Sequence, residues 1–317
     1  MKTALVLSGG GAKGAYHVGV SKALNDLNFP LDLVSGTSVG ALVAAMITQG
    51  DVKRLVDIWW NLEPKQVYRR NWKIKFFFSF QMQYIYPYFS SEPLEKLIFD
   101  NIDSERIQKS DKKLIITACN QTLRRVVRFT NMFEDIPRAL LAAASIPIAF
   151  PPVFMSGFEF VDAGFIDNVP LKHAIEEGAE KIIVVLGNHP ADLPPPIKNN
   201  LEWALWLTDI AHVNNVFADI EMVKKINSSE SREGKGYKLI ELTIIAPSRR
   251  LDLNVADFHK RKAIREAIKM GYKDAMRAFN SKLRNGEVDL EDIMKTTFGE
   301  EEGGREKEIY YLCNESG

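Results

Sequence analysis

A serine between two glycines is the first candidate for chemistry in this sequence. Ser38 is the central residue of Gly36-Thr37-Ser38-Val39-Gly40, the Gly-x-Ser-x-Gly pattern of a nucleophile on a sharp turn from a strand into a helix. A mostly apolar stretch precedes it at 31–34 and another follows at 41–47. A hydroxyl at a helix N-terminus lies where backbone N–H groups favour developing negative charge. The alternative is that Ser38 only caps the helix of an ordinary strand-to-helix connection.

A glycine-rich loop near the N-terminus offers a second set of reactive groups. It runs from Gly9 to Gly14 and follows a short apolar strand expected at 3–7. Successive glycine N–H groups can point at one position, and such a nest binds an anion. Beside a nucleophile the nest would act as an oxyanion hole. The candidate donors are Gly9, Gly10 and Gly11, with Lys13 as a weaker candidate that anchors the loop or contacts a substrate phosphate.

The same loop also matches Gly-x-Gly-x-x-Gly, the dinucleotide-binding fingerprint. That interpretation requires an acidic residue at the end of the second strand, where it would bind the ribose hydroxyls. Here the second strand ends in Ser35-Gly36 and continues into the Ser38 turn. No Lys-Ser/Thr pair follows the last glycine, so the loop is not a P-loop either. A tight turn without any ligand remains the alternative.

Two carboxylates further along the chain could act as the base for Ser38. Asp162 follows a short strand expected at 158–161, and Asp167 lies in the loop before a helix expected at 171–178. Asp167 precedes Asn168 and Pro170, a sequence typical of a helix N-terminus, so it has a structural explanation. Asp162 has none beyond that of a turn former, and it is the better candidate for the base.

The glycine loop after the first strand and the Gly-Thr-Ser-Val-Gly turn after the second resemble the patatin-like phospholipases, over roughly residues 3–280. This resemblance implies a three-layer α/β/α fold with a mostly parallel central sheet and helices on both faces. It also implies acyl hydrolysis by a dyad of Ser38 and Asp162, without a catalytic histidine and with the glycine loop as oxyanion hole. The family's Asp-Gly-Gly or Asp-Gly-Ala motif falls on residues 162–164, with Ala163 in place of a glycine. If that position needs a positive φ, the loop is strained.

We therefore expect a serine acyl hydrolase that needs no cofactor and cleaves fatty-acyl esters of phospholipids, lysophospholipids or related lipids. Two other classes stay open: a non-catalytic lipid-surface adaptor that keeps the fold, and a nucleotide-binding protein. A serine–histidine–aspartate triad is a further alternative. Its histidine would be His173, His189, His212 or His259. No Cys/His cluster has zinc-ligand spacing, and no acidic loop is typical of calcium binding.

The segment at 65–90 mixes aromatic and basic residues without an acid before Glu92. Its aromatic residues between 66 and 89 are Tyr68, Trp72, Phe76, Phe77, Phe78, Phe80, Tyr84, Tyr86, Tyr88 and Phe89, and its basic residues are Lys65, Arg69, Arg70, Lys73 and Lys75. Rings at headgroup level with cations near phosphates suit a lipid interface. A cap packed over the active site and a dimer face are the alternatives.

Composition sets the outer limits of these interpretations. The chain has 317 residues, of which 41 are basic and 41 acidic, so its net charge gives no general attraction to nucleic acid. Two distant cysteines, Cys119 and Cys313, indicate a reducing compartment. The N-terminal apolar run is too short for a signal peptide, and no stretch reaches the roughly 18 apolar residues of a membrane span. We expect a cytoplasmic protein that can contact a membrane surface, with its oligomeric state left open.

One domain at 1–284 and an acidic, mobile tail at 285–317 are expected from the pattern of the chain. Hydrophobic periodicity and end signals predict the elements that must position the candidate residues. The predicted helices lie at 15–27, 51–62, 92–99, 136–145, 201–226 and 256–283, and the predicted strands at 113–120, 124–130, 181–187 and 237–245.

Overall fold

The computed structural model describes residues 1–70, 87–188, 218–228 and 239–284, together with Trp203, Ile210 and Asn215. Several sequence predictions therefore lie largely outside the described residues. They are the centre of the aromatic segment at 71–86, most of the helix at 201–226, and the tail at 285–317.

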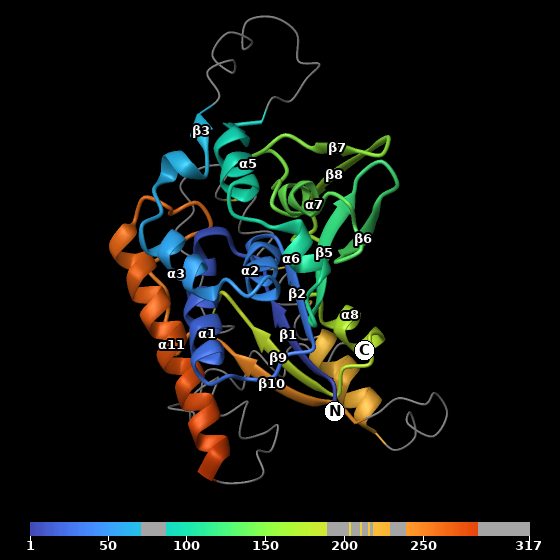
Figure 1. Cartoon of the computed structure of the whole chain (residues 1–317), viewed down its shortest axis with the longest axis vertical. Helices are drawn as coiled ribbons and strands as arrows, with labels where there is room; N and C mark the ends of the chain where they lie inside the picture. Colours follow the sequence, from blue (N-terminus) through green and yellow to red (C-terminus); the bar gives the residue numbers. More distant parts are fainter. Residues whose placement is uncertain are drawn as a thin grey trace, which may run out of the picture.

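A mostly parallel sheet of eight strands lies at the centre of the described fold (Figure 1). Its order is β10-β9-β1-β2-β5-β8-β7, and β6 pairs with β5. The first five strands of this order are parallel, whereas β6, β7 and β8 join by antiparallel pairing. The bounds are β1 Thr3–Leu7, β2 Leu33–Thr37, β5 Lys113–Asn120, β6 Arg125–Thr130, β7 Val153–Met155, β8 Phe158–Asp162, β9 Lys181–Val185 and β10 Glu241–Ile245.

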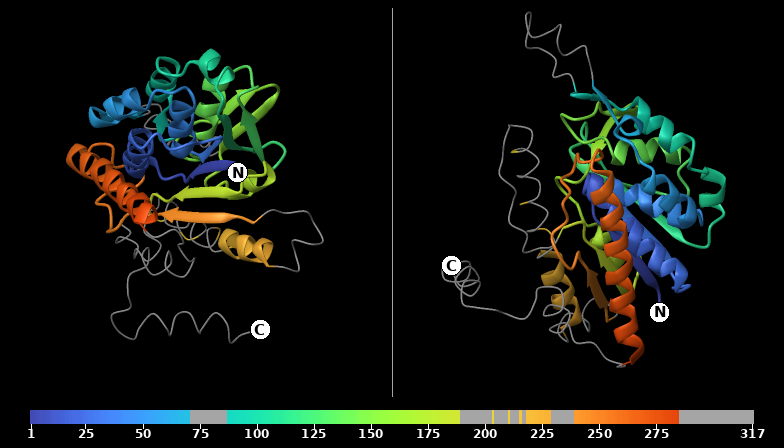
Figure 2. Two further views of the ribbon diagram at one scale, coloured as in Figure 1. Left: turned by 60° about the horizontal axis from the view of Figure 1, so that its bottom comes forward. Right: turned by 90° about the vertical axis from the view of Figure 1, so that its left-hand side faces the viewer.

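Helices cover both faces of the sheet, so the fold has three layers (Figure 2). One face carries α1 (Gly14–Asp26), α2 (Val39–Thr48), α3 (Val52–Trp60) and α11 (Arg261–Arg284), and the other carries α8 (Leu171–Glu176) and helical residues 218–227. Alternate residues of β1 enter the two interiors: Leu5 and Leu7 join the core with α1 and α2, whereas Ala4 and Val6 join the core with α8. The predicted three-layer architecture is confirmed.

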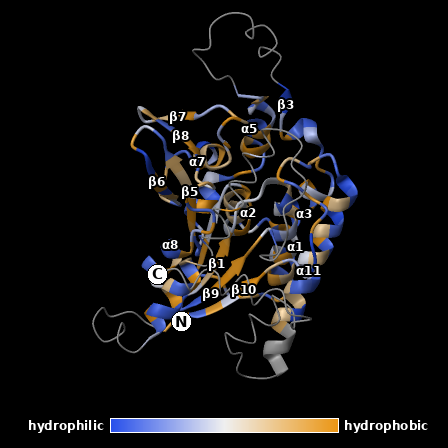
Figure 3. Ribbon diagram, turned by 180° about the vertical axis from the view of Figure 1, so that it is seen from behind, coloured by the Kyte–Doolittle hydropathy of each residue, from blue (hydrophilic) through white to orange (hydrophobic). Residues whose placement is uncertain are grey.

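Shorter elements connect these layers. They are η1 (Gly11–Lys13), η2 (Pro64–Gln66), β3 (Arg69–Arg70), β4 (Phe89–Ser90), α5 (Glu92–Phe99), α6 (Ser104–Gln108) and α7 (Ile136–Ala143). Helix α5 packs against α7 and η2, and β3 pairs with β4 at the same end of the molecule (Figure 1). Seen from behind, the central strands are mostly hydrophobic, whereas α11 carries residues of both kinds (Figure 3).

Two glycines allow α1 and α11 to cross at close range. A Cβ atom on Gly19 would lie 2.0 Å from the carbonyl oxygen of Ile268, and one on Gly271 would lie 2.2 Å from that of Tyr16. The Tyr16 hydroxyl donates to the carbonyl oxygen of Ala246 at 2.7 Å and lies 3.1 Å from Asp274 Oδ2. Burial, and then the Asp274 carboxylate, raise the pKa of Tyr16 well above its usual range. This crossing fixes the last described helix to the first.

Most predicted elements are confirmed within a few residues, but the start of the last helix is wrong. Helix α11 begins at Arg261 and not at residue 256. Backbone groups just before α11 form hydrogen bonds outside a helix: the Val255 carbonyl accepts from Ala12 N at 2.9 Å, and Asn254 N donates to Asp257 Oδ2 at 2.8 Å. The helix α6 and the strand β7 were not predicted. Among the described residues, no helix is both long enough and apolar enough to cross a bilayer.

Candidate active site

Ser38 lies alone between β2 and α2, on a sharply bent backbone. Its φ of 55° and ψ of −131° form a strained combination for a residue with a side chain. A Cβ atom on Gly36 would lie 2.3 Å from the carbonyl carbon of Gly40, and one on Gly40 would lie 2.4 Å from the Leu7 carbonyl oxygen. Both positions therefore require glycine. The Ser38 side chain makes no capping hydrogen bond to α2, so a capping role does not explain it.

Asp162 ends β8 at the same edge of the sheet. Strand β5 lies between β2 and β8: Thr37 pairs with Thr117, and the next residue, Ala118, pairs with Asp162. Ser38 directly follows Thr37, so Ser38 and Asp162 stand at one level on either side of β5. Adjacent strands lie about 4.8 Å apart, so the backbones of these two residues are separated by roughly 10 Å.

The backbone around Asp162 holds its carboxylate in a buried position. Asp162 is 3% exposed, its N–H donates to the Ser145 carbonyl at 2.9 Å, and its Oδ1 accepts from Gly164 N at 2.7 Å. The strain considered for Ala163 does not arise, because Ala163 is not among the residues with positive φ. Its carbonyl instead accepts from the N–H groups of Ile166 and Asp167 and closes a tight turn.

Asn168 is a site residue that the sequence interpretation missed, because it was explained as part of a helix start. Its carbonyl oxygen accepts from Gly9 N at 3.1 Å. Its Oδ1 lies 2.3 Å from where a Cβ on Gly9 would stand and 3.5 Å from where one on Gly164 would stand. Oδ1 is buried without a hydrogen-bond partner among the described residues. Asn168 thus links the glycine loop to the turn after Asp162.

The glycine loop lies next to Ser38. A Cβ atom on Gly9 would lie 3.1 Å from Ser38 Cβ. The Gly9 N–H already donates to Asn168, which removes it from the predicted oxyanion donors. Gly10 and Gly11 have φ values of 152° and 56°, and among the described residues no acceptor takes a hydrogen bond from either N–H group. Gly11 also lines the same pocket as Ser38.

A buried histidine in α1 contacts Ser8, the residue before this loop. His17 is fully buried, and its Nε2 lies 3.3 Å from Ser8 Oγ. The Ser8 hydroxyl donates to the Gly9 carbonyl at 3.0 Å and accepts from Gly187 N at 3.0 Å. Burial lowers the pKa of His17 to about 3, so its ring is neutral at physiological pH. His17 therefore supports the loop without adding a charge.

The other candidate residues have separate surroundings. Lys13 is buried within η1 beside Gly10 and Gly187, which fits the predicted anchoring of the loop. His173 Nε2 lies 2.9 Å from Asp167 Oδ2, and His259 is exposed beside Asp257. Neither histidine contacts Ser38, and His189 and His212 lie outside the described residues. Among the described residues, no group of three His, Cys, Asp or Glu side chains could hold a metal ion.

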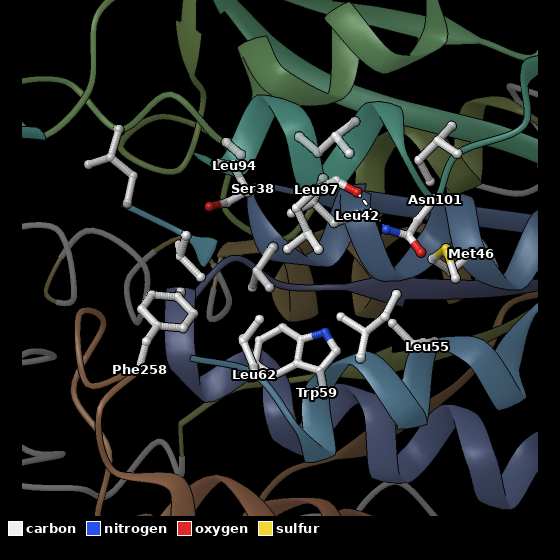
Figure 4. Close-up of a pocket in the computed structure, with 18 of the residues that line it drawn as sticks. Ser38, Leu42, Met46, Leu55, Trp59, Leu62, Leu94, Leu97, Asn101 and Phe258 are labelled. Carbon is white, nitrogen blue, oxygen red and sulfur yellow. Dashed lines mark hydrogen bonds between the residues drawn. The ribbon is translucent and has the colours of Figure 1, made fainter. Parts of the chain in front are cut away.

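An apolar pocket opens at Ser38 and extends between three helices (Figure 4). Its walls come from α2, α3 and α5, with Leu42, Trp59 and Leu97 as representative side chains. The rest of the lining is Gly11, Val39, Met46, Leu55, Ile58, Leu62, Val67, Leu94, Ile98, Asn101, Ile102, Ala144, Ile146, Phe150, Val255 and Phe258. These residues come from distant parts of the chain, so no local sequence pattern announced the pocket.

The described ends of the aromatic segment form one side of this pocket. Val67 is buried and lines it. The Tyr68 ring lies 4.6 Å from the Phe89 ring and 6.1 Å from the Phe258 ring, measured between centroids. Phe89 in turn lies 6.2 Å from Phe150. These contacts favour the interpretation as a cap for residues 66–70 and 87–89.

This combination of a serine on a sharp turn, a glycine loop, an aspartate level with that serine and an apolar pocket agrees with the sequence comparison. The chain belongs to the patatin-like phospholipase family, whose sequence model matches residues 5–175. The matched range contains the glycine loop, Ser38 and Asp162, and it ends before β9, β10 and α11.

Fungal lysophospholipases are similar to part of this chain. Lysophospholipase NTE1 of Yarrowia lipolytica is 26% identical over 212 residues, which are 64% of this chain and 14% of that protein. Lysophospholipase NTE1 of Scheffersomyces stipitis is 30% identical over 191 residues, 57% of this chain and 11% of that protein. The chain thus spans a small part of these relatives. A solved structure of VipD from Legionella pneumophila aligns with 88% of this chain and 67% of its own, at 16% identity and a TM-score of 0.49.

Proposed function

We propose that this chain is a serine acyl hydrolase that cleaves fatty-acyl esters of lysophospholipids or related lipids. The observation that carries the proposal is the opening of an apolar pocket at the strained Ser38, at the level of the buried Asp162 across β5. Family membership and the lysophospholipase names of the relatives support the same class of substrate.

In the first half of the proposed reaction, Ser38 Oγ attacks the ester carbonyl carbon and its proton passes to the Asp162 carboxylate. The N–H groups of Gly10 and Gly11 stabilise the oxyanion, and a single such donor is typically worth about 3 kcal/mol of barrier. The C–O bond to the alcohol then breaks, and Asp162 returns the proton to the leaving oxygen. The acyl group remains on Ser38.

In the second half, water attacks the acyl-enzyme and gives one proton to Asp162. The Ser38–acyl bond breaks, the proton returns to Ser38 Oγ, and a fatty acid leaves. The dyad needs no cofactor for either half. The hydrogen bond from Gly164 N to Asp162 Oδ1 holds the buried carboxylate in place for its role as base.

A nucleotide-binding function is not favoured by the loop contacts. The Gly9 and Ala12 N–H groups already donate to the carbonyl oxygens of Asn168 and Val255. A diphosphate at this loop would meet those two acceptor oxygens, and among the described residues of the loop only the Gly10 and Gly11 N–H groups would be available to bind it. The non-catalytic adaptor is the alternative that the reactive-serine experiment below tests directly.

We also propose that the rim of the pocket contacts a lipid surface. Tyr88 and Ile148 are 48% and 45% exposed, and Tyr88 N donates to the Ile148 carbonyl, so they form one apolar patch. Phe150, close in the chain, lines the pocket, and Arg69 and Arg70 lie in the neighbouring strand β3. We expect sedimentation with anionic vesicles to fall for Tyr88→Asp with Ile148→Asp, and to be unaffected by Leu123→Asp in the β5–β6 turn.

The function is tested with a fluorophosphonate probe, which labels activated serines. We expect the wild type to be labelled, Ser38→Ala to be unlabelled, and Asp162→Asn to be labelled at least 100-fold more slowly, the order of a lost general base. Ser35→Ala, a buried serine in the adjacent strand, is the matched control. A folded wild type that is never labelled would support the adaptor instead.

A further inference from the structure

We infer that the pocket is a blind acyl-chain site with a floor at Met46 and Asn101, and that its depth selects acyl chains of about ten carbons. The inference rests on the proposed function for its reaction, and it adds a chain-length preference set by named residues.

The depth of the pocket from Ser38 can be measured along helix α2. Ser38, Leu42 and Met46 are four residues apart, line the pocket and follow one face of the helix. At 1.5 Å per residue, Met46 lies about 12 Å along the helix from Ser38. A hydrocarbon zigzag with bonds of about 1.5 Å and angles near 111° advances roughly 1.25 Å per carbon. About ten carbons therefore span the distance from the serine to the floor.

Asn101 closes the far end with a polar network. Its Nδ2 donates to the Leu97 carbonyl at 2.8 Å, and its Oδ1 accepts from Arg54 Nε at 3.0 Å. Its backbone carbonyl accepts from Gln49 Nε2 at 2.9 Å. Figure 4 shows Leu42 between Ser38 on one side and Asn101 and Met46 on the other. These bonds join the ends of α2 and α5 to α3.

A second layer of charged groups lies behind this floor. Arg106 Nη2 donates to the Gln49 carbonyl at 2.6 Å, and Arg106 Nη1 lies 2.9 Å from Asp51 Oδ2. Asp103 N donates to Gln49 Oε1 at 3.0 Å. A chain longer than the pocket would have to separate these groups and desolvate charges, whereas each methylene buried inside the pocket improves binding about fourfold. The gain from chain length should therefore stop at the floor.

The inference is tested first by binding, because binding requires no catalysis. Isothermal titration calorimetry with saturated fatty acids from hexanoate to palmitate should show affinity that rises up to decanoate and no further. Leu42→Phe narrows the pocket halfway to the floor and should lower the ratio of decanoate to hexanoate affinity at least 10-fold. Leu123→Phe makes the same change at an exposed turn position and should leave that ratio unchanged.

A second variant deepens the site. Met46→Ala removes part of the floor and should move the optimum to chains longer than decanoate, whereas Met132→Ala, at an exposed position, should not. Hydrolysis of p-nitrophenyl butyrate, decanoate and palmitate gives the same comparison as ratios of kcat/KM. Affinity that continues to rise to palmitate, or ratios unchanged by both pocket variants, would overturn the inference. Normal binding profiles with no hydrolysis would contradict the proposed reaction and leave the inference supported.

Discussion

The two halves of the candidate site are built in different ways. At the sheet edge that carries Ser38, an added Cβ atom would lie 2.3 Å and 2.4 Å from backbone atoms at Gly36 and Gly40, and 2.3 Å from Asn168 Oδ1 at Gly9, so these positions leave no room for one additional carbon atom. In the pocket, side-chain volumes on three separate helices set the shape. At the sheet edge, even a substitution that adds one carbon atom should therefore lower the free energy of unfolding and the labelling of Ser38. In the pocket, the effect on stability and ligand affinity should follow the change in side-chain volume.

The largest effect is expected at the elbow. In Gly36→Ala the new methyl group would lie 2.3 Å from the carbonyl carbon of Gly40, and backbone contacts of this kind are not relieved by a rotamer change. We expect a loss of about 3 kcal/mol in the free energy of unfolding, measured by urea denaturation, together with loss of fluorophosphonate labelling. A stable, fully labelled variant would show that the edge is less rigid than described.

A change at Asn168 should separate stability from reactivity. Leucine in its place removes a buried oxygen that has no hydrogen-bond partner among the described residues, so stability should change by less than about 1 kcal/mol. The labelling rate should fall about 10-fold, because the carboxamide that lies between the glycine loop and Asp162 is lost. Stopped-flow labelling and urea denaturation check both values. If the loss in labelling rate, expressed as a free energy, is no larger than the loss in the free energy of unfolding, Asn168 has a purely structural role.

The free energy of unfolding should also depend on pH, through His17 beside the glycine loop. Its folded pKa of about 3 lies below the unfolded value of about 6.5, so the unfolded state binds the proton first. Stability is therefore full above pH 6.5 and falls by about 1.4 kcal/mol per pH unit as the pH drops from about 6.5 toward 3. His17→Gln removes this contribution. The difference between the two pH–stability curves should flatten above pH 7, and a constant difference at every pH would contradict the pKa assignment.

The smallest effect is expected on the pocket wall. Leu97→Met keeps the side-chain volume nearly constant, so both the free energy of unfolding and the decanoate affinity should change by less than about 1.5 kcal/mol. Urea denaturation and calorimetry measure them. A loss as large as that of Gly36→Ala would show that the wall is as sensitive as the edge.

The same difference explains what could be predicted from the sequence. Ser38 and the glycine loop follow the ends of β2 and β1, and Asp162 is the last residue of β8, so short local patterns at strand ends identify all three. The pairing of Ala118 with Asp162, which brings the carboxylate level with Ser38, depends on sheet order that local patterns do not contain. The pocket was missed because its lining comes from helices far apart in the chain. The start of α11 was misplaced because Val255 bonds to the glycine loop instead of continuing a helix.

Helix α11 also holds the outer wall of the pocket. Arg265 Nε donates to the carbonyl oxygen of Trp60, and Arg261 forms an ion pair with Glu63 at 2.9 Å, beside the pocket residues Trp59 and Leu62. Clipping the chain in front of α11 would leave Ser38, Asp162 and the glycine loop in the remaining polypeptide. It would also remove both contacts that hold α3 and its C-terminal end in place, so the pocket would open on that side and the lipid substrate that we propose would lose an apolar wall.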